Sequence, residues 1–396
     1  TNRINTPEKG EEILAAGKAD MVSMARPLLA DSEFVRKAEQ GRSDEINTCI
    51  ACNQACLDHV FQARRASCLV NPRACHETEL VLTVAPVVRR VAVVGAGPAG
   101  LAAATTAAKR GHKVTLFDAD DQIGGQFNYA KRIPGKEEFF ETLRYFQRQI
   151  ELLQIDLKLN TRVDSTALAE QDFDDVIIAT GVKPRTPKID GIDHPKVLGY
   201  LDVLRHNKPV GKTVAVIGAG GIGFDVSEFL THDFGQHPEG EQVSVADWQA
   251  EWGVNPTFEG PGGLAEREPT PSPRKIYLMQ RKTGKVGGGL GKTSGWVHRN
   301  SLKHRDVEML RGCRYDRIDD QGLHITLTDK DGKAQERKVL PVDNVIICAG
   351  QEPKRELFDQ LTKSGVKAHL IGGADLAEEL DAKRAIRQGT EVAAAI

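Results

Sequence analysis

The pattern of apolar and polar residues predicts two repeats of a parallel α/β arrangement. In each repeat a short apolar run is followed by a glycine turn, a helical segment and another apolar run. This order is typical of a βαβ unit, because two parallel strands need a crossover that is usually a helix. The predicted strands are residues 90–94, 113–118, 213–217 and 275–280, and the predicted helices end at Lys109 and near Leu230.

Further segments indicate that one repeat is inserted into the other. They are a helix at 136–153, strands at 175–179, 344–348 and 369–371, and a C-terminal helix. Because strand–glycine patterns return near the end of the chain, we expect one domain at 85–205 and 340–396, interrupted by a second at 206–339. Residues 233–273, rich in Gly, Pro and Glu, are expected to form a long irregular insertion.

The first part of the chain predicts two strand–helix units that cannot form a core by themselves. A helical pattern covers residues 7–17, a short apolar strand covers 20–24, and a second helix covers 31–40. Two such units cannot bury their apolar faces against each other. We therefore expect residues 1–46 to be the end of a larger barrel or sheet whose earlier, N-terminal portion is missing from this chain.

Composition excludes several classes of protein. The 396 residues correspond to about two or three domains. Lys and Arg number 53 against 55 Asp and Glu, and only 5% of residues are aromatic, so a nucleic-acid partner is not expected. No apolar run is long enough for a membrane span and no cleavable signal sequence opens the chain, which favours a cytoplasmic protein with a small-molecule substrate.

Five of the seven cysteines lie between residues 49 and 75, which indicates a local metal site. The spacing is Cys49-x2-Cys52-x3-Cys56-x11-Cys68. Four thiolates at such a spacing can hold an iron–sulfur cluster or a tetrahedral zinc ion. The second pair is not a zinc knuckle and flavin-type motifs follow, so the pattern favours the cluster, with zinc or unmetallated cysteines as alternatives. Cys75 lies outside the spacing.

A glycine fingerprint follows the strand at 90–94. In Gly95-Ala-Gly97-Pro-Ala-Gly100 the first glycine makes the turn, the second admits a pyrophosphate and the third packs the helix on the sheet. Asp118 closes the next strand, where a carboxylate can bind a ribose. The Gly-Gly-Gln motif ending at Gln126, and the Gly-Gly-Ala-Asp motif ending at Asp375, favour FAD at this site.

The second fingerprint is Gly218-Ala-Gly220-Gly-Ile-Gly223, and its next strand ends in Gln-Arg281-Lys282 rather than an acid. A carboxylate there would repel a 2′-phosphate, whereas two cations would pair with one, so we expect NADPH rather than NADH. The alternative is that both cations simply face solvent. Trp296, after a glycine-rich run, is a candidate for stacking at the nicotinamide–flavin junction or for ordinary packing.

The only CxxC motif belongs to the cysteine cluster, so no redox disulfide is expected beside the flavin. Hydride from NADPH would then leave FAD as single electrons toward the cluster.

These motifs, in this order, resemble the bacterial NADPH-dependent 2,4-dienoyl-CoA reductases, and more distantly trimethylamine dehydrogenase and other enzymes with an old-yellow-enzyme barrel. The resemblance is specific at residues 19–27, 45–56, 67–76 and 289–296. It implies an α/β fold with a remnant of a (β/α)8 FMN-type barrel, a four-cysteine iron–sulfur segment at 47–84, and two nested Rossmann-like dinucleotide-binding domains. It also implies a role in fatty-acid β-oxidation.

The resemblance carries cofactor roles to individual residues. The four cysteines would hold a [4Fe-4S] cluster. Residues implied to bind FMN phosphate in the intact enzyme are Arg3, Ala25 and Arg26. Residues implied to bind FAD are Ala99, Asp118, Gln126, Lys136, Val163 and Asp375, and those for NADP are Arg281 and Lys282.

The implied activity passes electrons from NADPH through FAD and the cluster to FMN, and then to a 2,4-dienoyl-CoA. The family's proton-donating tyrosine and histidine lie in earlier barrel strands, so no catalytic residue is assigned in this chain. The alternatives are an amine dehydrogenase that sends electrons to an external carrier, and a non-enzymatic four-cysteine zinc module.

Overall fold

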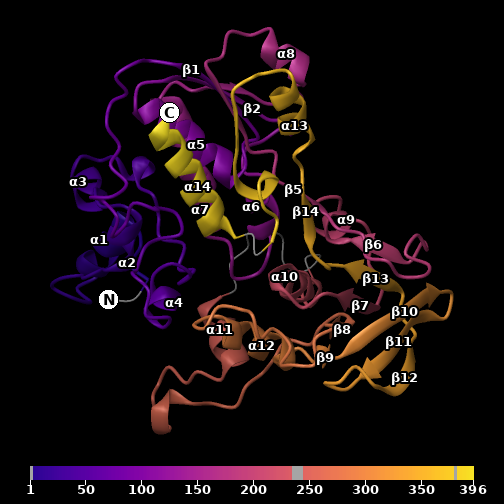
Figure 1. Ribbon diagram of the computed structural model, residues 1–396. Helices are drawn as coiled ribbons and strands as arrows, with labels where there is room; N and C mark the ends of the chain where they lie inside the picture. Colours follow the sequence, from indigo (N-terminus) through magenta and orange to yellow (C-terminus); the bar gives the residue numbers. More distant parts are fainter. Residues whose placement is uncertain (1–2, 234–243, 379–380) are drawn as a thin grey trace. The chain divides into compact units, whose positions relative to one another are not determined.

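The computed structural model describes residues 3–233, 244–378 and 381–396. The chain divides into two compact units, which are described separately (Figure 1). Unit 1 comprises Thr1–Lys131, Gly135–Lys183 and Gln351–Ile396, and unit 2 comprises Arg132–Pro134 and Pro184–Gly350. Unit 2 thus interrupts unit 1 in the sequence, over a longer stretch than the 206–339 expected.

Unit 1 is built on a five-stranded parallel sheet. Its strands run in the order β15-β4-β1-β2-β3. Their bounds are Ala368–Leu370, Asp175–Ile178, Arg90–Val94, Lys113–Phe117 and Asp156–Lys158. Val91, Ala92 and Val93 of β1 have no exposed surface. The strand is apolar throughout because both faces of a parallel sheet are covered.

Helix α5 (Pro98–Lys109) connects β1 to β2, and α14 (Ala382–Ala395) lies beside it (Figure 1). Their close approach depends on Gly389, where an added Cβ would lie 2.2 Å from the carbonyl oxygen of Ala99. Half of the residues of α5 are alanines, because the helix is buried between the sheet and α14.

The remaining elements of unit 1 surround this sheet. They are α6 (Phe127–Ala130), α7 (Phe139–Leu152), α8 (Ser165–Ala169), α13 (Glu356–Lys363), the 3-10 helix η3 (Gly372–Ala374), and the paired strands β5 (Val182–Pro184) and β14 (Gln351–Pro353). The last residue of β5, Pro184, belongs to unit 2.

Unit 2 contains a second parallel sheet of the same size, in the order β6-β13-β7-β8-β9. The strands are Val197–Gly199, Asn344–Ile347, Thr213–Ile217, Lys275–Met279 and Glu308–Leu310, and the helices α9, α10 and α12 are Tyr200–Leu204, Gly221–Leu230 and Gly295–His304. The two parallel sheets and their glycine-turn helices confirm the predicted α/β class.

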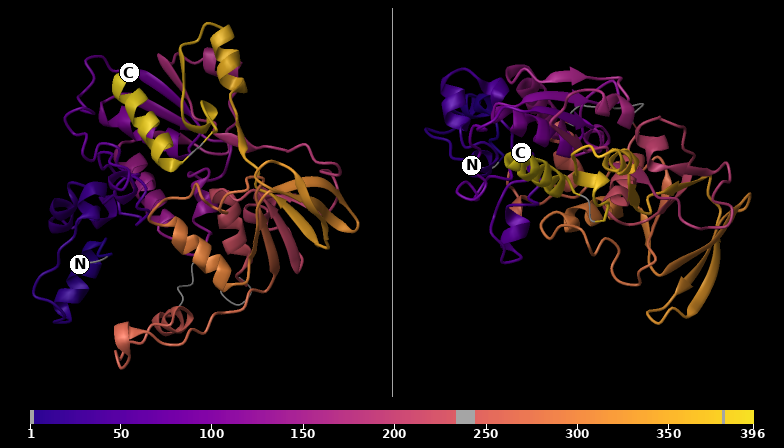
Figure 2. Two further views of the ribbon diagram at one scale, coloured as in Figure 1. Left: turned by 60° about the horizontal axis from the view of Figure 1, so that its bottom comes forward. Right: turned by 45° about the horizontal axis from the view of Figure 1, so that its top comes forward.

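Two parts of unit 2 differ from expectation. Strands β10 (Cys313–Asp319), β11 (Gly322–Thr328) and β12 (Ala334–Leu340) form an antiparallel sheet that was not predicted (Figure 2). The segment 233–273 is not irregular throughout, because α11 (Val245–Trp252) lies within it. Ser244 caps this helix by accepting a hydrogen bond from the N–H of Asp247, a signal that the Gly- and Pro-rich surroundings obscured. Residues 234–243 of this prediction lie outside the described part.

The N-terminal part of unit 1 is helical. It contains α1 (Pro7–Ala15), α2 (Arg26–Ala30), α3 (Phe34–Glu39), η1 (Ser43–Glu45) and α4 (Leu57–Val60). The strand predicted at 20–24 is wrong: this segment lies outside regular structure, and Met21 is 80% exposed. A strand needs a hydrogen-bonded neighbour, and none pairs with this segment among the described residues. The barrel remnant therefore stays a proposal.

No helix in the described ranges combines the length and the apolar character that crossing a bilayer requires.

A buried carboxylate joins the N-terminal ends of β1, β4 and β15 in the unit 1 sheet, and its removal should be measurable. Asp175 has no exposed side-chain surface and pairs with Arg89, Lys367 and His369 at 2.6, 2.7 and 2.9 Å. Burial alone would raise its pKa, but the hydrogen bonds from Lys367, His369 and Arg89 outweigh it and lower the pKa to about 2.

Asp175→Asn should reduce the free energy of unfolding at neutral pH by about 2–3 kcal/mol. Since the folded-state pKa is depressed, this stabilisation is present above the unfolded value near 3.9 and is lost as pH falls toward about 2. Denaturant unfolding at several pH values measures it. Equal stability of wild type and variant at pH 7 would contradict the assignment.

Candidate functional site

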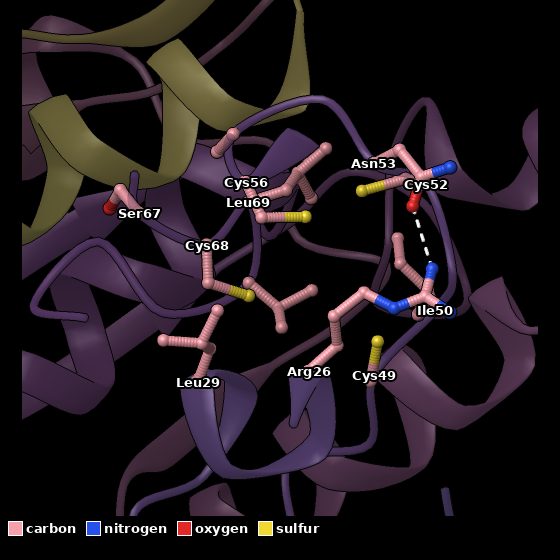
Figure 3. A pocket seen from close by; sticks show the side chains of 12 residues that line it. Arg26, Leu29, Cys49, Ile50, Cys52, Asn53, Cys56, Ser67, Cys68 and Leu69 are labelled. Atoms are coloured by element: carbon pink, nitrogen blue, oxygen red, sulfur yellow. Dashed lines mark hydrogen bonds between the residues drawn. The ribbon is translucent and has the colours of Figure 1, made fainter. Parts of the chain in front are cut away.

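Four cysteines surround one pocket in unit 1 (Figure 3). Cys49, Cys52 and Cys56 come from the loop that leads into α4, and Cys68 comes from the loop after it. Their side chains point toward a common space between the loops and α2. The other lining residues are Arg26, Leu29, Ile50, Asn53, Ala55, Ser67, Leu69 and Val70. The structure thus brings together the four cysteines that the spacing singled out.

The cysteine loop winds tightly through two unusual backbone conformations. Ala51 and Asn53 have φ of +53° and +60°, in the left-handed region. Asparagine tolerates this region better than most residues because its side chain can hydrogen-bond locally. The Asn53 carbonyl then accepts a hydrogen bond from the N–H of Asp58 at 3.0 Å. The loop therefore turns once between Cys49 and Cys52 and again between Cys52 and Cys56, which carries its cysteines around the pocket.

The cysteine segment is packed against the dinucleotide-binding part of unit 1. Ile50, Leu69 and Val70 share a buried cluster with Ala102 of α5 and Ile386 of α14. The cysteine segment is therefore part of unit 1 and not a separate folding unit.

Hydrogen bonds add to this packing. The side-chain nitrogen of Asn47 donates to the Val70 carbonyl at 3.0 Å, and its main-chain N–H donates to Asp31 at 2.9 Å. Asp31 is itself held by Lys37 at 2.6 Å. These bonds join the two cysteine loops to the preceding helices.

Two thiols of the pocket, those of Cys52 and Cys68, are held in the neutral form by burial. Burial raises the pKa of Cys52 and of Cys68 to about 12, although the N–H of Gln54 and those of Val70 and Asn71 hydrogen-bond to the respective sulfurs. A metal displaces these protons, and the N–H donors would then stabilise the thiolates. The donor set fits a thiophilic metal group.

Zinc and an iron–sulfur cluster make different demands on four cysteines. Within the described ranges, no three His, Cys, Asp or Glu side chains are placed to hold one metal ion. Tetrahedral zinc needs four ligands about 2.0–2.3 Å from a single ion, whereas an iron–sulfur cluster binds each cysteine through a different iron. The choice of the cluster over zinc therefore stays a prediction.

The other cysteines lie apart from this pocket. Cys75 is exposed, Cys313 and Cys348 are buried, and none of the seven, all of which are described, forms a disulfide. Burial raises the pKa of the Cys348 thiol, so this side chain behaves as a small apolar residue.

The first glycine fingerprint has the geometry that a dinucleotide site requires. Gly95 has φ of +110°, and a Cβ there would lie 2.3 Å from the carbonyl oxygen of Ala179. A Cβ at Gly100 would lie 1.8 Å from the carbonyl oxygen of Gly95. Gly97, the N-cap of α5, has ordinary φ and ψ and meets nothing closer than Gly125 at 4.0 Å. Two glycines thus serve the fold, and the third leaves space beside the helix N-terminus.

Several residues predicted to bind FAD lie around this turn. Asp118 follows β2 and accepts hydrogen bonds from the N–H groups of Ala96 and Asp120 at 2.6 and 2.8 Å. The N–H of Gly124, two residues before Gln126, donates to the Ala96 carbonyl at 2.8 Å. The structure therefore brings Asp118 and the Gly-Gly-Gln motif to the fingerprint loop, and their contact with FAD stays a prediction.

The Gly-Gly-Ala-Asp motif also reaches this turn. A Cβ at Gly372 would lie 2.7 Å from the side chain of Ala99. Gln388 of α14 accepts a hydrogen bond from the N–H of Gly372 and donates to Asp375, both at 2.8 Å. The sequence analysis did not identify Gln388, because no sequence motif connects it with Asp375, which lies 13 positions earlier.

Lys136 precedes α7 and is partly buried, and Val163 lies in the loop after β3 and packs beside the sheet. Their roles in FAD binding stay predictions.

The second fingerprint repeats this geometry in unit 2. Gly218 has φ of +110° and a Cβ there would lie 2.4 Å from the carbonyl oxygen of Cys348. A Cβ at Gly223 would lie 1.7 Å from the carbonyl oxygen of Gly218. Around Gly220, the N-cap of α10, an added Cβ meets no atom within 4 Å. In both units, therefore, the first and third glycines are required by close backbone contacts, and the middle glycine leaves free space at the helix N-terminus.

The predicted phosphate-binding cations follow β8, the strand beside β7. Arg281 and Lys282 are both exposed. The carbonyl of Lys282 accepts hydrogen bonds from the side chain of Gln280 and the N–H of Gly312, which anchor the loop backbone. Trp296, in α12, is 56% exposed. The side chains of Arg281 and Lys282 are thus available to a ligand at a strand end.

Replacing Arg281 and Lys282 together with alanine should weaken NADPH binding more than about tenfold and NADH binding hardly at all. A charged hydrogen bond to a phosphate contributes roughly 1.5–3 kcal/mol to binding. NADH has no 2′-phosphate, so its binding does not include this bond. Equilibrium titration with both nucleotides measures the ratio. Equal losses for both would show that these residues do not bind the 2′-phosphate.

The three residues predicted to bind FMN phosphate do not share one environment. Arg3 pairs with Glu138, and Ala25 is the N-cap of α2. Arg26 lines the four-cysteine pocket, where its Nη1 donates to Asn53 Oδ1 at 2.7 Å. Their role toward FMN stays a prediction.

Comparison with known proteins gives the family. Residues 89–382 match the family of pyridine nucleotide-disulphide oxidoreductases, and residues 1–45 match the NADH:flavin oxidoreductase / NADH oxidase family. A metal reductase of Desulforamulus reducens is 34% identical over 381 residues, 94% of this chain and 54% of that protein. A bilirubin reductase of Mediterraneibacter gnavus is 30% identical over 390 residues, 98% of this chain and 53% of that protein.

Among solved structures, a 2-naphthoyl-CoA reductase in complex with 2-naphthoyl-CoA is 27% identical, with a TM-score of 0.83, and the match covers 100% of this chain and 53% of that one. The chain spans about half the length of the curated relatives described above. The fingerprints and the matched residues agree: the chain belongs to the pyridine nucleotide-disulphide oxidoreductase family and is a flavin-dependent oxidoreductase.

Proposed function

We propose that this chain passes electrons from NADPH through FAD to a [4Fe-4S] cluster held by Cys49, Cys52, Cys56 and Cys68. In a longer protein the electrons would continue to FMN and reduce a 2,4-dienoyl-CoA in fatty-acid oxidation. The observation that carries the proposal is that all four cysteines line one pocket of the unit that also contains the first fingerprint. The match to an acyl-CoA reductase supports the substrate class.

The flavin would supply the conversion between two-electron hydride transfer and one-electron transfer. The chain's own residues bind and orient. Gly97 and Gly220 leave open space at helix N-termini, where main-chain N–H groups can hold a pyrophosphate. Arg281 and Lys282 would select the 2′-phosphate, and the N–H groups around Cys68 would stabilise bound thiolate. The CxxC pair lines the metal pocket, so it is not proposed as a redox disulfide.

The proposal separates electron entry from substrate reduction. The chain reconstituted with FAD and its cluster should reduce ferricyanide with NADPH, because hydride transfer needs only nicotinamide and flavin in aligned geometry. It should not reduce a 2,4-dienoyl-CoA, because no acid is assigned here to protonate the product carbanion. Parallel absorbance assays measure both. NADPH-driven loss of dienoyl-CoA absorbance by this chain would refute the division.

The amine dehydrogenase alternative makes a different prediction. In that alternative electrons do not enter from NADPH, so NADPH added anaerobically would leave the flavin bands unchanged. Our proposal predicts full bleaching by NADPH. A colourless preparation containing zinc would instead support the non-enzymatic alternative.

A further inference from the structure

A positively charged side chain forms part of the wall of the four-cysteine pocket. Arg26 is the first residue of α2, and its side chain runs along the wall of the pocket toward Asn53, beside Cys49 (Figure 3). It is half-buried. The guanidinium is therefore partly shielded from solvent, where electrostatic interactions are stronger than in water.

The position of this guanidinium is set by the cysteine loop itself. Asn53 lies between Cys52 and Cys56, and its Oδ1 accepts the hydrogen bond from Arg26 Nη1 at 2.7 Å. The left-handed backbone of Asn53, with φ of +60°, places this acceptor at the pocket rim. The loop that supplies the metal ligands thus also supplies an acceptor for the cation.

A fixed positive charge at this place has a predictable effect on a redox group. Adding an electron makes a thiolate-bound cluster more negative by one unit. A nearby cation stabilises the reduced form more than the oxidised form, and so raises the midpoint potential. Charge and hydrogen bonding around the sulfurs are among the main factors that set such potentials.

We propose that Arg26, held by Asn53, sets the reduction potential of the cluster and keeps it high enough to accept electrons from the flavin. This inference rests on the proposed function, because it requires the cluster. It differs from the role implied by resemblance, which assigns Arg26 to FMN phosphate. The two roles separate experimentally, because the cluster potential is measured on this chain without FMN.

The test compares Arg26→Gln, which removes the charge, with Arg26→Lys, which keeps it. Each anaerobically prepared protein is assayed for iron and acid-labile sulfide, and the midpoint potential is measured by redox titration followed by electron paramagnetic resonance. Arg26→Gln should retain its iron and disfavour reduction about tenfold, which is about 59 mV for one electron. Arg26→Lys should stay much closer to wild type.

Asn53→Gly provides a second variant, because glycine keeps the left-handed backbone while it removes the acceptor. It should shift the potential in the same direction as Arg26→Gln and by less. An unchanged potential in an iron-replete Arg26→Gln protein would overturn the inference and leave the proposed function standing. Loss of iron from both Arg26 variants would show a structural role and also overturn it. Wild-type protein that binds no iron would instead overturn the proposed function, and the inference with it.

Discussion

Alanine at Gly220 should leave unit 2 folded and weaken NADPH binding by about ten- to a hundredfold. The glycine has φ and ψ of −85° and −170°, which any residue adopts, and the added Cβ meets no protein atom within 4 Å. A methyl group there would occupy the space through which a pyrophosphate approaches the helix N-terminus. Losing one charge-assisted hydrogen bond costs about 1.5–3 kcal/mol. Thermal unfolding and NADPH titration measure the two effects independently.

The matched control is Gly223→Ala in the same fingerprint. Its Cβ would lie 1.7 Å from the carbonyl oxygen of Gly218, so the backbone must shift at a cost of about 1–3 kcal/mol or more. This variant should lose stability, whereas Gly220→Ala should not. Wild-type NADPH affinity in Gly220→Ala would show that the fingerprint is not the nucleotide site. Equal destabilisation of both variants would contradict the geometry.

Cys52→Ala should remove the iron from the protein while FAD remains bound. Each cysteine holds one corner of a cubane cluster. Losing one ligand exposes an iron to solvent and leads to loss of the cluster. FAD should remain because the turn at Gly95 is formed by its own contact with Ala179, apart from the cysteine loops. Iron analysis and flavin absorbance of the purified variant measure both cofactors.

Cys75→Ala is the control for this experiment, because Cys75 is exposed and does not line the pocket. It should retain iron at the wild-type level. A Cys52→Ala protein with full iron and sulfide content would overturn the ligand assignment. Because the cysteine segment packs on α5 and α14, unfolding should also be followed, so that loss of FAD by unfolding is recognised.

The features that sequence reasoning predicted well are local ones. A tight turn such as Gly95–Gly100 fixes strand, loop and helix within a few residues, because steric limits on φ and close approaches leave only glycine possible. The strands that precede these turns are buried on both faces, and their uninterrupted apolar runs are easily recognised. The four cysteines likewise lie close enough in sequence for their spacing to be informative.

The features that it missed depend on contacts between distant residues. Strand β12 has a largely polar, exposed sequence, so its pairing with β11 leaves no clear apolar pattern. Asp175 pairs with Lys367 and His369 across almost two hundred residues. The segment 20–24 has residues that suit a strand, but no strand pairs with it among the described residues, so it does not form one.

An anaerobic titration of the purified protein with NADPH, followed by absorbance and electron paramagnetic resonance, tests the central claim most directly. The claim is that nicotinamide, flavin and cluster form one path for electrons. It predicts that NADPH bleaches the flavin bands and that the signal of a reduced iron–sulfur cluster appears in the same titration. A fully bleached flavin with an iron-replete cluster that stays oxidised at every NADPH concentration would contradict it.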